Sequence, residues 1–195
     1  MGVENHRQKL VIFEGLSCSG KTSLVDSTAS NNNCVCVVRS VPRDLQNPIP
    51  EYFMQNDEIK FAKTKDCSGT ILMDRGYLST LVFYTTMEEI RQDGSGFKVK
   101  GWVEKNIGKT IFKPDYYIFI DVPPEISRER AKINGRPFDE RNLWMTHTDK
   151  MLFQYEQYLS TIEADVPLVR LDGTKPLVYL QEQLKIFLDK LHEER

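Results

Sequence analysis

One short pattern constrains the fold of this chain more than any other feature. Residues 15–22 read Gly-Leu-Ser-Cys-Ser-Gly-Lys-Thr, follow the apolar run 10–13 and precede a segment that can form a helix. This is the G-x-x-x-x-G-K-[ST] pattern of a phosphate-binding loop, in the strand–loop–helix setting that the motif requires. Such a loop curls its backbone N–H groups around phosphate oxygens, and the following helix directs its positive end to the same place. The sequence therefore predicts a site for a nucleoside triphosphate.

The residues of this loop have distinct expected roles. We expect the Lys21 ammonium to reach the β- and γ-phosphates and the Thr22 hydroxyl to hold Mg²⁺. Cys18 lies near the start of the helix, a position that tends to lower the pKa of a thiol. The residues expected to contact ATP here are Gly15, Leu16, Ser17, Cys18, Ser19, Gly20, Lys21, Thr22 and Ser23.

Short apolar runs alternate with helical patterns along the chain, which is typical of a parallel sheet covered by helices. The runs predict strands at 9–14, 34–39, 70–74, 116–121 and 167–171. Helices are expected near 21–30, 50–64, 77–92, 99–107, 124–133, 142–163 and 175–192, with a turn or flexible link at 93–96. Five strongly apolar strands in 195 residues favour an α/β three-layer sandwich with a five-stranded parallel sheet. One domain, 1–195, accounts for the chain.

A second pattern stands at the end of the third predicted strand, where Asp74 and Arg75 directly follow the apolar run 70–73. The carboxyl ends of parallel strands form the edge of the sheet where ligands bind, and the phosphate-binding loop leaves its strand at that same edge. Asp74 can therefore hold Mg²⁺, directly or through water, and Arg75 can bind a phosphate or a transferring oxygen. The alternative is a structural ion pair that caps the next helix.

Cations crowd the segment after the fourth predicted strand, around a Gly-Arg-Pro hinge. They are Arg128, Arg130, Lys132, Arg136 and Arg141. A small mobile lid at about 130–142 would bring guanidinium groups onto the phosphates and exclude water when it closes. Arg130 and Arg136 are the first candidates for this role, and Arg141 is the next. Acidic residues between the cations leave open an ordinary solvated helix face.

Two further segments hold candidate residues near the same edge of the sheet. The turn after the last predicted strand contains Asp172, Gly173 and Thr174, and its backbone could lie against a purine base. Just beyond the second strand, Asp44 is placed to take a proton from a hydroxyl acceptor, and Arg43 could instead bind an acceptor phosphate. Both segments can equally be ordinary loops.

Composition narrows the range of partners. A net charge of −2, from 26 basic and 28 acidic residues, argues against nucleic acid as the main partner. No apolar stretch approaches the ~18 residues that a membrane span needs, and the first residues lack the hydrophobic core of a secretion signal. We therefore expect a cytoplasmic protein without a membrane partner, whose four cysteines are reduced thiols.

Taken together, these patterns resemble the thymidylate kinase family of P-loop kinases, which neighbours the deoxynucleoside kinases. The match covers nearly the whole chain, and its most specific parts are residues 13–22 and the segment 74–83, with Asp74, Arg75, Ser79 and Phe83. Residues 114–125, the lid arginines and residues 172–174 support it. The resemblance implies a nucleoside monophosphate kinase-like fold and transfer of the γ-phosphoryl group of Mg-ATP. It also implies that Arg75 binds the acceptor or the transferring phosphate and that Asp74 organises Mg²⁺.

The chain departs from the family in the residues that read the acceptor. Ser17 stands where thymidylate kinases usually carry an Asp that helps to hold the acceptor sugar. Asp57 and Lys65 stand four residues after Phe53 and Phe61, where an Arg that reads thymine would be expected. The resemblance thus predicts a kinase without naming its acceptor base.

Several interpretations of the activity stay open. A nucleoside monophosphate acceptor is favoured. Its phosphate oxygen can attack without a general base. Catalysis would then consist of positioning and charge neutralisation by Lys21, Arg75, Mg²⁺ and the lid. A nucleoside or another hydroxyl acceptor would use Asp44 as a base. A regulatory ATPase is disfavoured because residues 74–77 lack D-x-x-G spacing and the chain has no N-K-x-D. Retention of Lys21 and Arg75 disfavours a family member without turnover.

The apolar helix face 77–83 fits either a homodimer contact or a core-facing helix.

Overall fold

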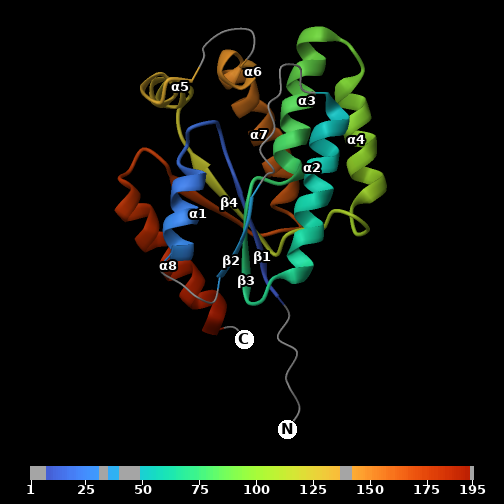
Figure 1. The fold of residues 1–195 in the computed structure, drawn as a ribbon. Coiled ribbons are helices and arrows are strands. Elements are labelled where there is room, and N and C mark those ends of the chain that lie inside the picture. The colour runs from blue at the N-terminus through green and yellow to red at the C-terminus, as the bar shows by residue number, and fades with distance from the viewer. Residues whose placement is uncertain (1–7, 31–34, 40–48, 137–141, 194–195) are drawn as a thin grey trace.

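The computed structural model describes residues 8–30, 35–39, 49–136 and 142–193 (Figure 1). Five strands form one parallel sheet in the order β2-β3-β1-β4-β5. They are β1 (Leu10–Glu14), β2 (Val35–Val38), β3 (Thr70–Asp74), β4 (Tyr116–Asp121) and β5 (Leu168–Asp172). The predicted five-stranded parallel sheet is confirmed, and each strand begins and ends within one residue of its predicted bounds.

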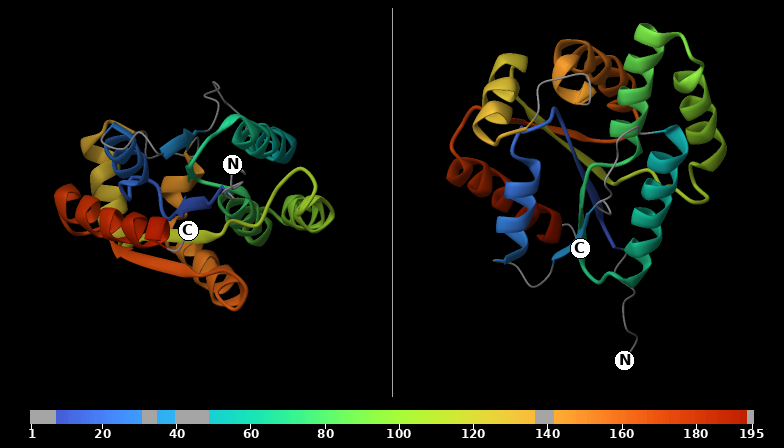
Figure 2. Two further views of the ribbon diagram at one scale, coloured as in Figure 1. Left: turned by 90° about the horizontal axis from the view of Figure 1, so that it is seen from below. Right: turned by 45° about the horizontal axis from the view of Figure 1, so that its top comes forward.

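Helices cover both faces of this sheet, as the two further views in Figure 2 show. The helices on one face are α1 (Lys21–Ser30) and α8 (Leu177–Glu193). Those on the other are α2 (Pro50–Lys63), α3 (Tyr77–Arg91) and α7 (Thr148–Ile162), with α4 (Ser95–Asn106) packed on α3. Two more, α5 (Pro124–Ile133) and α6 (Leu143–Thr146), lie beyond the carboxyl ends of the strands (Figure 1). The α/β three-layer sandwich expected from the sequence is thus confirmed.

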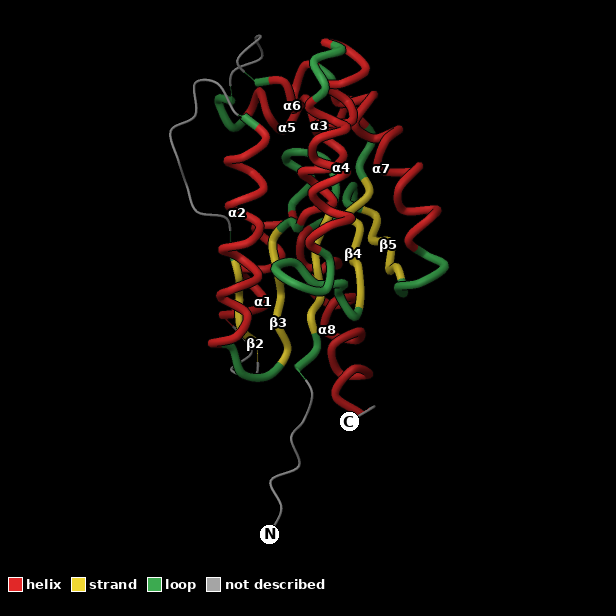
Figure 3. Tube along the Cα trace, turned by 90° about the vertical axis from the view of Figure 1, so that its right-hand side faces the viewer, coloured by secondary structure: helices red, strands yellow, loops and turns green. Residues whose placement is uncertain are grey.

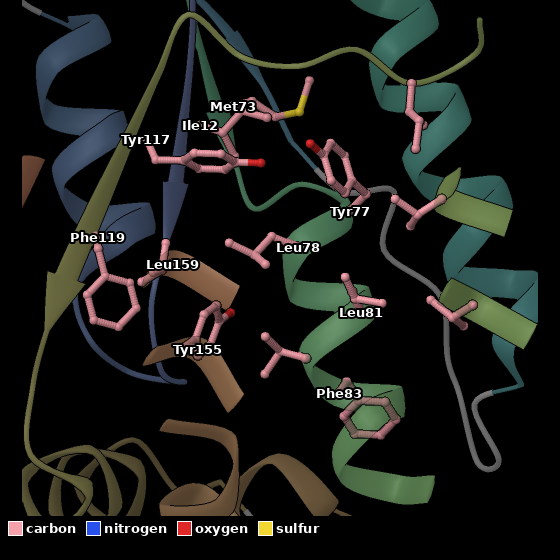
Figure 4. Close-up of a cluster of buried hydrophobic side chains, with 14 of the residues drawn as sticks. Ile12, Met73, Tyr77, Leu78, Leu81, Phe83, Tyr117, Phe119, Tyr155 and Leu159 are labelled. Carbon is pink, nitrogen blue, oxygen red and sulfur yellow. The ribbon is translucent and has the colours of Figure 1, made fainter. Parts of the chain in front are cut away.

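Strand β1 shows why the sheet must be covered on both sides. All five of its residues are buried. Ile12 packs on the α3 and α7 side, whereas Val11 and Phe13 pack on the α1 and α8 side, because alternate residues of a strand point to opposite faces. Figure 4 shows the larger of the two clusters, between the sheet and helices α3 and α7. Its labelled members are Ile12, Met73, Tyr77, Leu78, Leu81, Phe83, Tyr117, Phe119, Tyr155 and Leu159.

The helix predicted at 142–163 is two helices, α6 and α7. His147 lies between them with φ −118° and ψ 31°, outside the helical region. Thr148, which is buried, donates its hydroxyl to the Met145 carbonyl at 2.8 Å and so supports the break. The apolar periodicity continues across this interruption, which is why the sequence pattern did not reveal it.

Helix α4 begins at Ser95, earlier than the predicted start at residue 99, so the link at 93–96 belongs partly to the helix. Two carboxylates satisfy its first backbone N–H groups: Asp93 accepts from Ser95 at 3.0 Å, and Glu88 accepts from Gly96 at 3.1 Å. A Cβ at Gly96 would lie 2.7 Å from the Glu88 Cβ. This glycine therefore permits a close approach of α4 to α3.

The cysteines differ from expectation. Cys36 on β2 and Cys67, just before β3, form a disulfide with their Cα atoms 5.7 Å apart, so the expected reduced state is wrong for these two. The parallel pairing of β2 with β3, in which Cys36 lies opposite Ile71, brings them together. Cys18 is a free thiol, and Cys34 lies outside the described residues.

No helix in the described part of the chain combines the length and the apolar character that crossing a membrane would demand.

Candidate active site

The phosphate-binding loop joins the end of β1 to the start of α1. Three of its residues have positive φ: Gly15 (137°), Cys18 (56°) and Gly20 (103°). A Cβ at Gly15 would lie 2.5 Å from the carbonyl oxygen of Ile120 on β4, so only glycine fits there. Cys18 holds a left-handed conformation that costs a non-glycine residue about 1 kcal/mol. The loop is therefore strongly curled, as its sequence pattern predicts.

A cleft of about 630 Å³ opens over this loop, a volume typical of small-ligand sites. Residues 17–23 form its floor. Its other lining residues come from the ends of β2, β3 and α5, from the segment that joins β5 to α8 and from the first turn of α8. They are Arg39, Asp74, Arg75, Arg130, Ile133, Asn134, Arg136, Gly173, Lys175, Leu177 and Leu180. The cleft thus brings together most of the residues that the sequence analysis placed at one edge of the sheet.

Lys21, the first residue of α1, is only 4% exposed. Its ammonium donates to the Gly15 carbonyl at 2.9 Å, the Leu16 carbonyl at 2.6 Å and the Ser19 hydroxyl at 2.9 Å. Burial lowers the pKa of Lys21 well below its usual value, and the nearby Arg75 guanidinium acts in the same direction. All three hydrogen bonds go to the loop that the motif predicts to surround the phosphates.

Thr22 and Asp74 meet across the gap between α1 and β3. The Thr22 hydroxyl donates to the Asp74 carboxylate at 2.6 Å. Both side chains offer oxygen, the ligand that Mg²⁺ prefers, and a magnesium site usually needs only one or two protein oxygens besides phosphate and water. Within the described ranges, no group of three or more His, Cys, Asp or Glu side chains gathers to hold a metal. The pair therefore fits a magnesium ion shared with a triphosphate.

Arg75 begins the turn from β3 to α3 and also has positive φ, 64°. Its guanidinium donates to the Gly15 carbonyl at 3.1 Å, the Ser79 hydroxyl at 2.9 Å and the Tyr155 hydroxyl at 3.2 Å. Lys21 donates to that same Gly15 oxygen. Two cations that lie far apart in the sequence thus meet at one carbonyl, beside the place expected for the end of the triphosphate.

Glu14 is a buried member of this site that the sequence analysis did not single out. Its carboxylate is fully buried and accepts hydrogen bonds from the Gly76 backbone at 2.9 Å, the Tyr155 hydroxyl at 3.1 Å and the Ser79 hydroxyl. Burial raises the pKa of Glu14, and the neighbouring Arg75 guanidinium partly opposes that shift. Its place directly before Gly15, as an acidic end to an apolar strand, was the signal that could have revealed it.

The lid candidates are positioned at the rim of the cleft. Arg136 donates to the Ser17 hydroxyl at 3.2 Å, and Arg130 donates to the Gly173 carbonyl at 2.8 Å. Arg128 instead pairs with Asp149 on α7. Arg141 and Asp44, predicted as an ATP contact and as a base, lie outside the described residues.

The turn after β5 places a glycine at the cleft. The Gly173 N–H donates to the Asp121 carbonyl at 2.7 Å, and a Cβ at Gly173 would lie 2.5 Å from the Val122 Cγ1 atom. The Asp172 carboxylate accepts from the Thr174 backbone at 3.0 Å and from its hydroxyl at 2.6 Å, which lowers the pKa of Asp172. Gly173 therefore lines the cleft with its backbone, while Asp172 and Thr174 shape the turn.

Two apolar side chains that the sequence analysis did not identify line the cleft. Ile133 at the end of α5 is 78% exposed, and Leu177 at the start of α8 is 40% exposed. An exposed isoleucine beside a polar cleft offers a surface on which a flat base can pack. Their apolar character was visible in the sequence, but their exposure was not.

No family model matches the chain. Solved structures do match it: deoxyadenosine kinase from M. mycoides with bound dATP has a TM-score of 0.75 over 92% of this chain and 99% of that chain, at 14% identity. Thymidylate kinase from Candida albicans has a TM-score of 0.73 over 97% of this chain and 94% of that chain, at 16% identity. This chain has the fold of the P-loop nucleoside and nucleotide kinases. The resemblance drawn from the sequence is confirmed at the level of the fold.

Proposed function

We propose that the protein is a P-loop kinase that transfers the γ-phosphoryl group of Mg-ATP to a nucleoside monophosphate. The observation that carries this proposal is the meeting of Lys21 and Arg75 at the Gly15 carbonyl. One cation belongs to the loop that would hold the donor. The other lies in the turn from β3 to α3, where an acceptor would approach the terminal phosphate.

On the donor side, the curled backbone and Lys21 would bind the β- and γ-phosphates. Thr22 and Asp74 would hold Mg²⁺, which neutralises charge on the phosphates when bound. Ile133, Leu177 and the Gly173 backbone would receive the base. Arg130 and Arg136 would close over the triphosphate and exclude water, which protects the γ-phosphoryl group from hydrolysis.

The cleft carries an excess of positive charge, which suits the triphosphate and is compatible with an acceptor that also carries a phosphate. Among the described residues that line it, Asp74 is the single carboxylate and it is bonded to Thr22. The cations that line it are Lys21, Arg39, Arg75, Arg130, Arg136 and Lys175. A monophosphate oxygen would attack the γ-phosphorus while the bond to the β-phosphate oxygen breaks, releasing ADP, and no proton has to be removed. Arg75 would stabilise the charge on the transferring group.

A nucleoside with a free hydroxyl is the second candidate acceptor. It is supported by the likeness of the fold to deoxyadenosine kinase, which is as close as that to thymidylate kinase. This reaction needs a carboxylate to take the hydroxyl proton. The sequence offers Asp44 for that role, on the segment just beyond β2.

A screen of acceptors tests the proposal. ATP labelled in the γ-phosphate is incubated with Mg²⁺ and a panel of nucleosides and nucleoside monophosphates, and the labelled product is identified. We expect label in a nucleoside diphosphate and ADP formation that depends on the acceptor. Label that appears in inorganic phosphate at the same rate with every acceptor would contradict the proposal and favour an ATPase.

The variant Asp44→Asn separates the two acceptor classes. With a monophosphate acceptor, we expect turnover within about threefold of wild type, because no base is required. A loss of about 100-fold in kcat with unchanged ATP affinity would favour the hydroxyl acceptor. Asp165→Asn, at an exposed residue paired with Lys113, is the matched control.

A further inference from the structure

Helix α2 carries a buried ion pair for which the mechanism above gives no role. Lys60 is 1% exposed and Asp57 is 2% exposed, and the two lie one helical turn apart. Removing two charges from water is costly unless hydrogen bonds compensate for the lost hydration. We therefore look to the hydrogen bonds of Lys60 and Asp57 for the role of this buried pair.

Lys60 reaches the junction between β3 and α3. Its ammonium donates to the Asp74 carbonyl at 3.1 Å and to the Arg75 carbonyl. Asp57 Oδ1 lies 3.7 Å from that ammonium, and Asp57 Oδ2 accepts from the Thr80 hydroxyl on α3 at 2.6 Å. The pair thus ties α2 to two consecutive carbonyls at the end of β3 and to the first turns of α3.

The two carbonyls bound by Lys60 lie on either side of an unfavourable backbone conformation. Arg75 has φ 64°, the left-handed region that non-glycine residues rarely adopt. On its other side, the Arg75 N–H donates to the Phe13 carbonyl at 3.0 Å. A conformation of this kind persists only where its surroundings fix it, and it sets the direction in which the Arg75 side chain leaves the backbone.

We propose that Lys60 is a positioning residue for phosphoryl transfer: held by Asp57, its ammonium fixes the left-handed backbone at Arg75 and thereby places the Arg75 guanidinium beside the Gly15 carbonyl. The inference rests on the proposed kinase function. Lys60 is absent from the residues that line the cleft, and it reaches the site through the backbone carbonyls of Asp74 and Arg75. A displacement of a catalytic group by 1 Å can cost about 100-fold in rate, which sets the size of the expected effect.

The test is a double substitution, Lys60→Met with Asp57→Asn, which removes the ammonium without leaving an unpaired buried carboxylate. We expect kcat to fall by about 100-fold while the KM for ATP stays within about threefold of wild type. The control is Phe61→Leu, a core substitution at the next residue of α2, which lowers the melting temperature without touching the carbonyls of residues 74 and 75. A fall in kcat no larger than that of Phe61→Leu would overturn the proposal.

A double-mutant cycle shows whether Lys60 acts through Arg75. Adding Arg75→Ala to the Lys60→Met/Asp57→Asn protein is expected to give a kcat within about threefold of Arg75→Ala alone, because the positioned group is already absent. Multiplicative losses would contradict the proposal. If the double substitution gives no folded protein, Lys60→Gln is judged by the same criteria.

A spectroscopic measurement keeps this inference separate from the proposed activity. In protein labelled with ¹⁵N-arginine, the side-chain N–H resonance of Arg75 is identified by its loss in Arg75→Lys. We expect this resonance to shift in the Lys60→Met/Asp57→Asn protein and to keep its position in Phe61→Leu. An unmoved resonance would overturn the role of Lys60 whether or not an acceptor is found. If no acceptor supports transfer but the resonance shifts, the proposed function fails and the positioning of Arg75 by Lys60 stands.

Discussion

The donor side and the acceptor side of the candidate site are built in different ways. The donor side is an open, polar cleft whose shape comes from backbone: the curl of residues 15–20 and the Gly173 turn. The side beyond Arg75 is packed with aromatic rings. The Trp144 ring stacks on Phe83 with centroids 5.1 Å apart, and the Arg75 guanidinium lies 4.8 Å from the centre of the same tryptophan ring.

Figure 3 faces the side of the sheet that is covered by α2, α3 and α4, and Figure 1 shows α1 and α8 on the opposite side. The difference has a physical origin. Phosphate groups are common to all nucleotides and can be bound by backbone N–H groups, so a short local motif encodes them. A base or sugar must be read by side chains from distant elements, and in the proposed function those would come from α2, α3 and α6, whose aromatic rings pack together beyond Arg75. A motif can therefore identify a phosphate donor without identifying the acceptor.

The largest expected effect is on the donor side. Lys21→Ala removes the buried ammonium, and we expect phosphoryl transfer to fall by about 1,000-fold, since a group of this kind stabilises charge in the transition state. Steady-state kinetics with the best acceptor from the screen measures it. Lys185→Ala, at an exposed position on α8, is the control. Near-normal turnover of Lys21→Ala would contradict the proposal that Lys21 and its loop bind the phosphates of ATP.

Arg75→Ala tests the meeting point of the two sides. We expect kcat to fall by about 100-fold while the Kd for ATP changes by less than about threefold, because the guanidinium acts on the acceptor or the transferring group. Calorimetric titration with ATP and steady-state rates separate the two effects. Wild-type rates would show that Arg75 takes no part in the reaction. A loss confined to ATP binding would show that Arg75 contributes to binding the donor.

Trp144→Ala addresses the aromatic side alone. Because the ring stacks on Phe83 and lies against Arg75, we expect the KM for the acceptor to rise by about tenfold with the KM for ATP unchanged. The other tryptophan, Trp102 on α4, donates to Glu58 and provides the control Trp102→Phe. Equal changes in both KM values would show that Trp144 does not distinguish the two sides.

The smallest effect is on stability and concerns Glu14, which lies between the two sides. Burial raises the pKa of Glu14, so between the unfolded-state pKa and the folded-state pKa the native state keeps a proton that the unfolded state has released. This contribution to stability is complete below pH 4.5 and is lost as pH rises through the folded-state pKa.

We therefore expect that Glu14→Gln gains stability relative to wild type as the pH rises from the unfolded-state pKa through the folded-state pKa of Glu14. Urea denaturation at several pH values measures the difference. Glu125→Gln, a surface substitution at the start of α5, controls for the loss of one carboxylate. A difference between Glu14→Gln and wild type that is the same at every pH would contradict the burial effect.

The parts of the molecule that could be predicted are those in which neighbouring residues act together. The strands could be placed because each is a short apolar run, and the loop because Gly15, Gly20 and Lys21 must follow one another at fixed spacing. Asp74 and Arg75 could be placed at the same edge because parallel strands end together. The predicted roles of Asp44 and Arg141 stay predictions.

What could not be predicted depends on contacts between distant residues. Lys60 resembles an ordinary surface lysine of an amphipathic helix, and only its burial against the carbonyls of residues 74 and 75 distinguishes it. The Glu14 carboxylate is held by hydrogen bonds from the Ser79 and Tyr155 hydroxyls, which are far from it in the sequence. The Cys36–Cys67 disulfide arises from the order of strands in the sheet, which local periodicity does not determine.

A crystal structure with a non-hydrolysable Mg-ATP analogue tests the central claim most directly. We predict that the β- and γ-phosphates lie on the backbone N–H groups of residues 15–22, and that Lys21 exchanges the Gly15 and Leu16 carbonyls for phosphate oxygens. Arg75 should then lie on the far side of the γ-phosphate, within hydrogen-bonding distance of it or of an adjoining acceptor site. A triphosphate bound away from the loop, or an Arg75 guanidinium turned away from the γ-phosphate, would contradict the account.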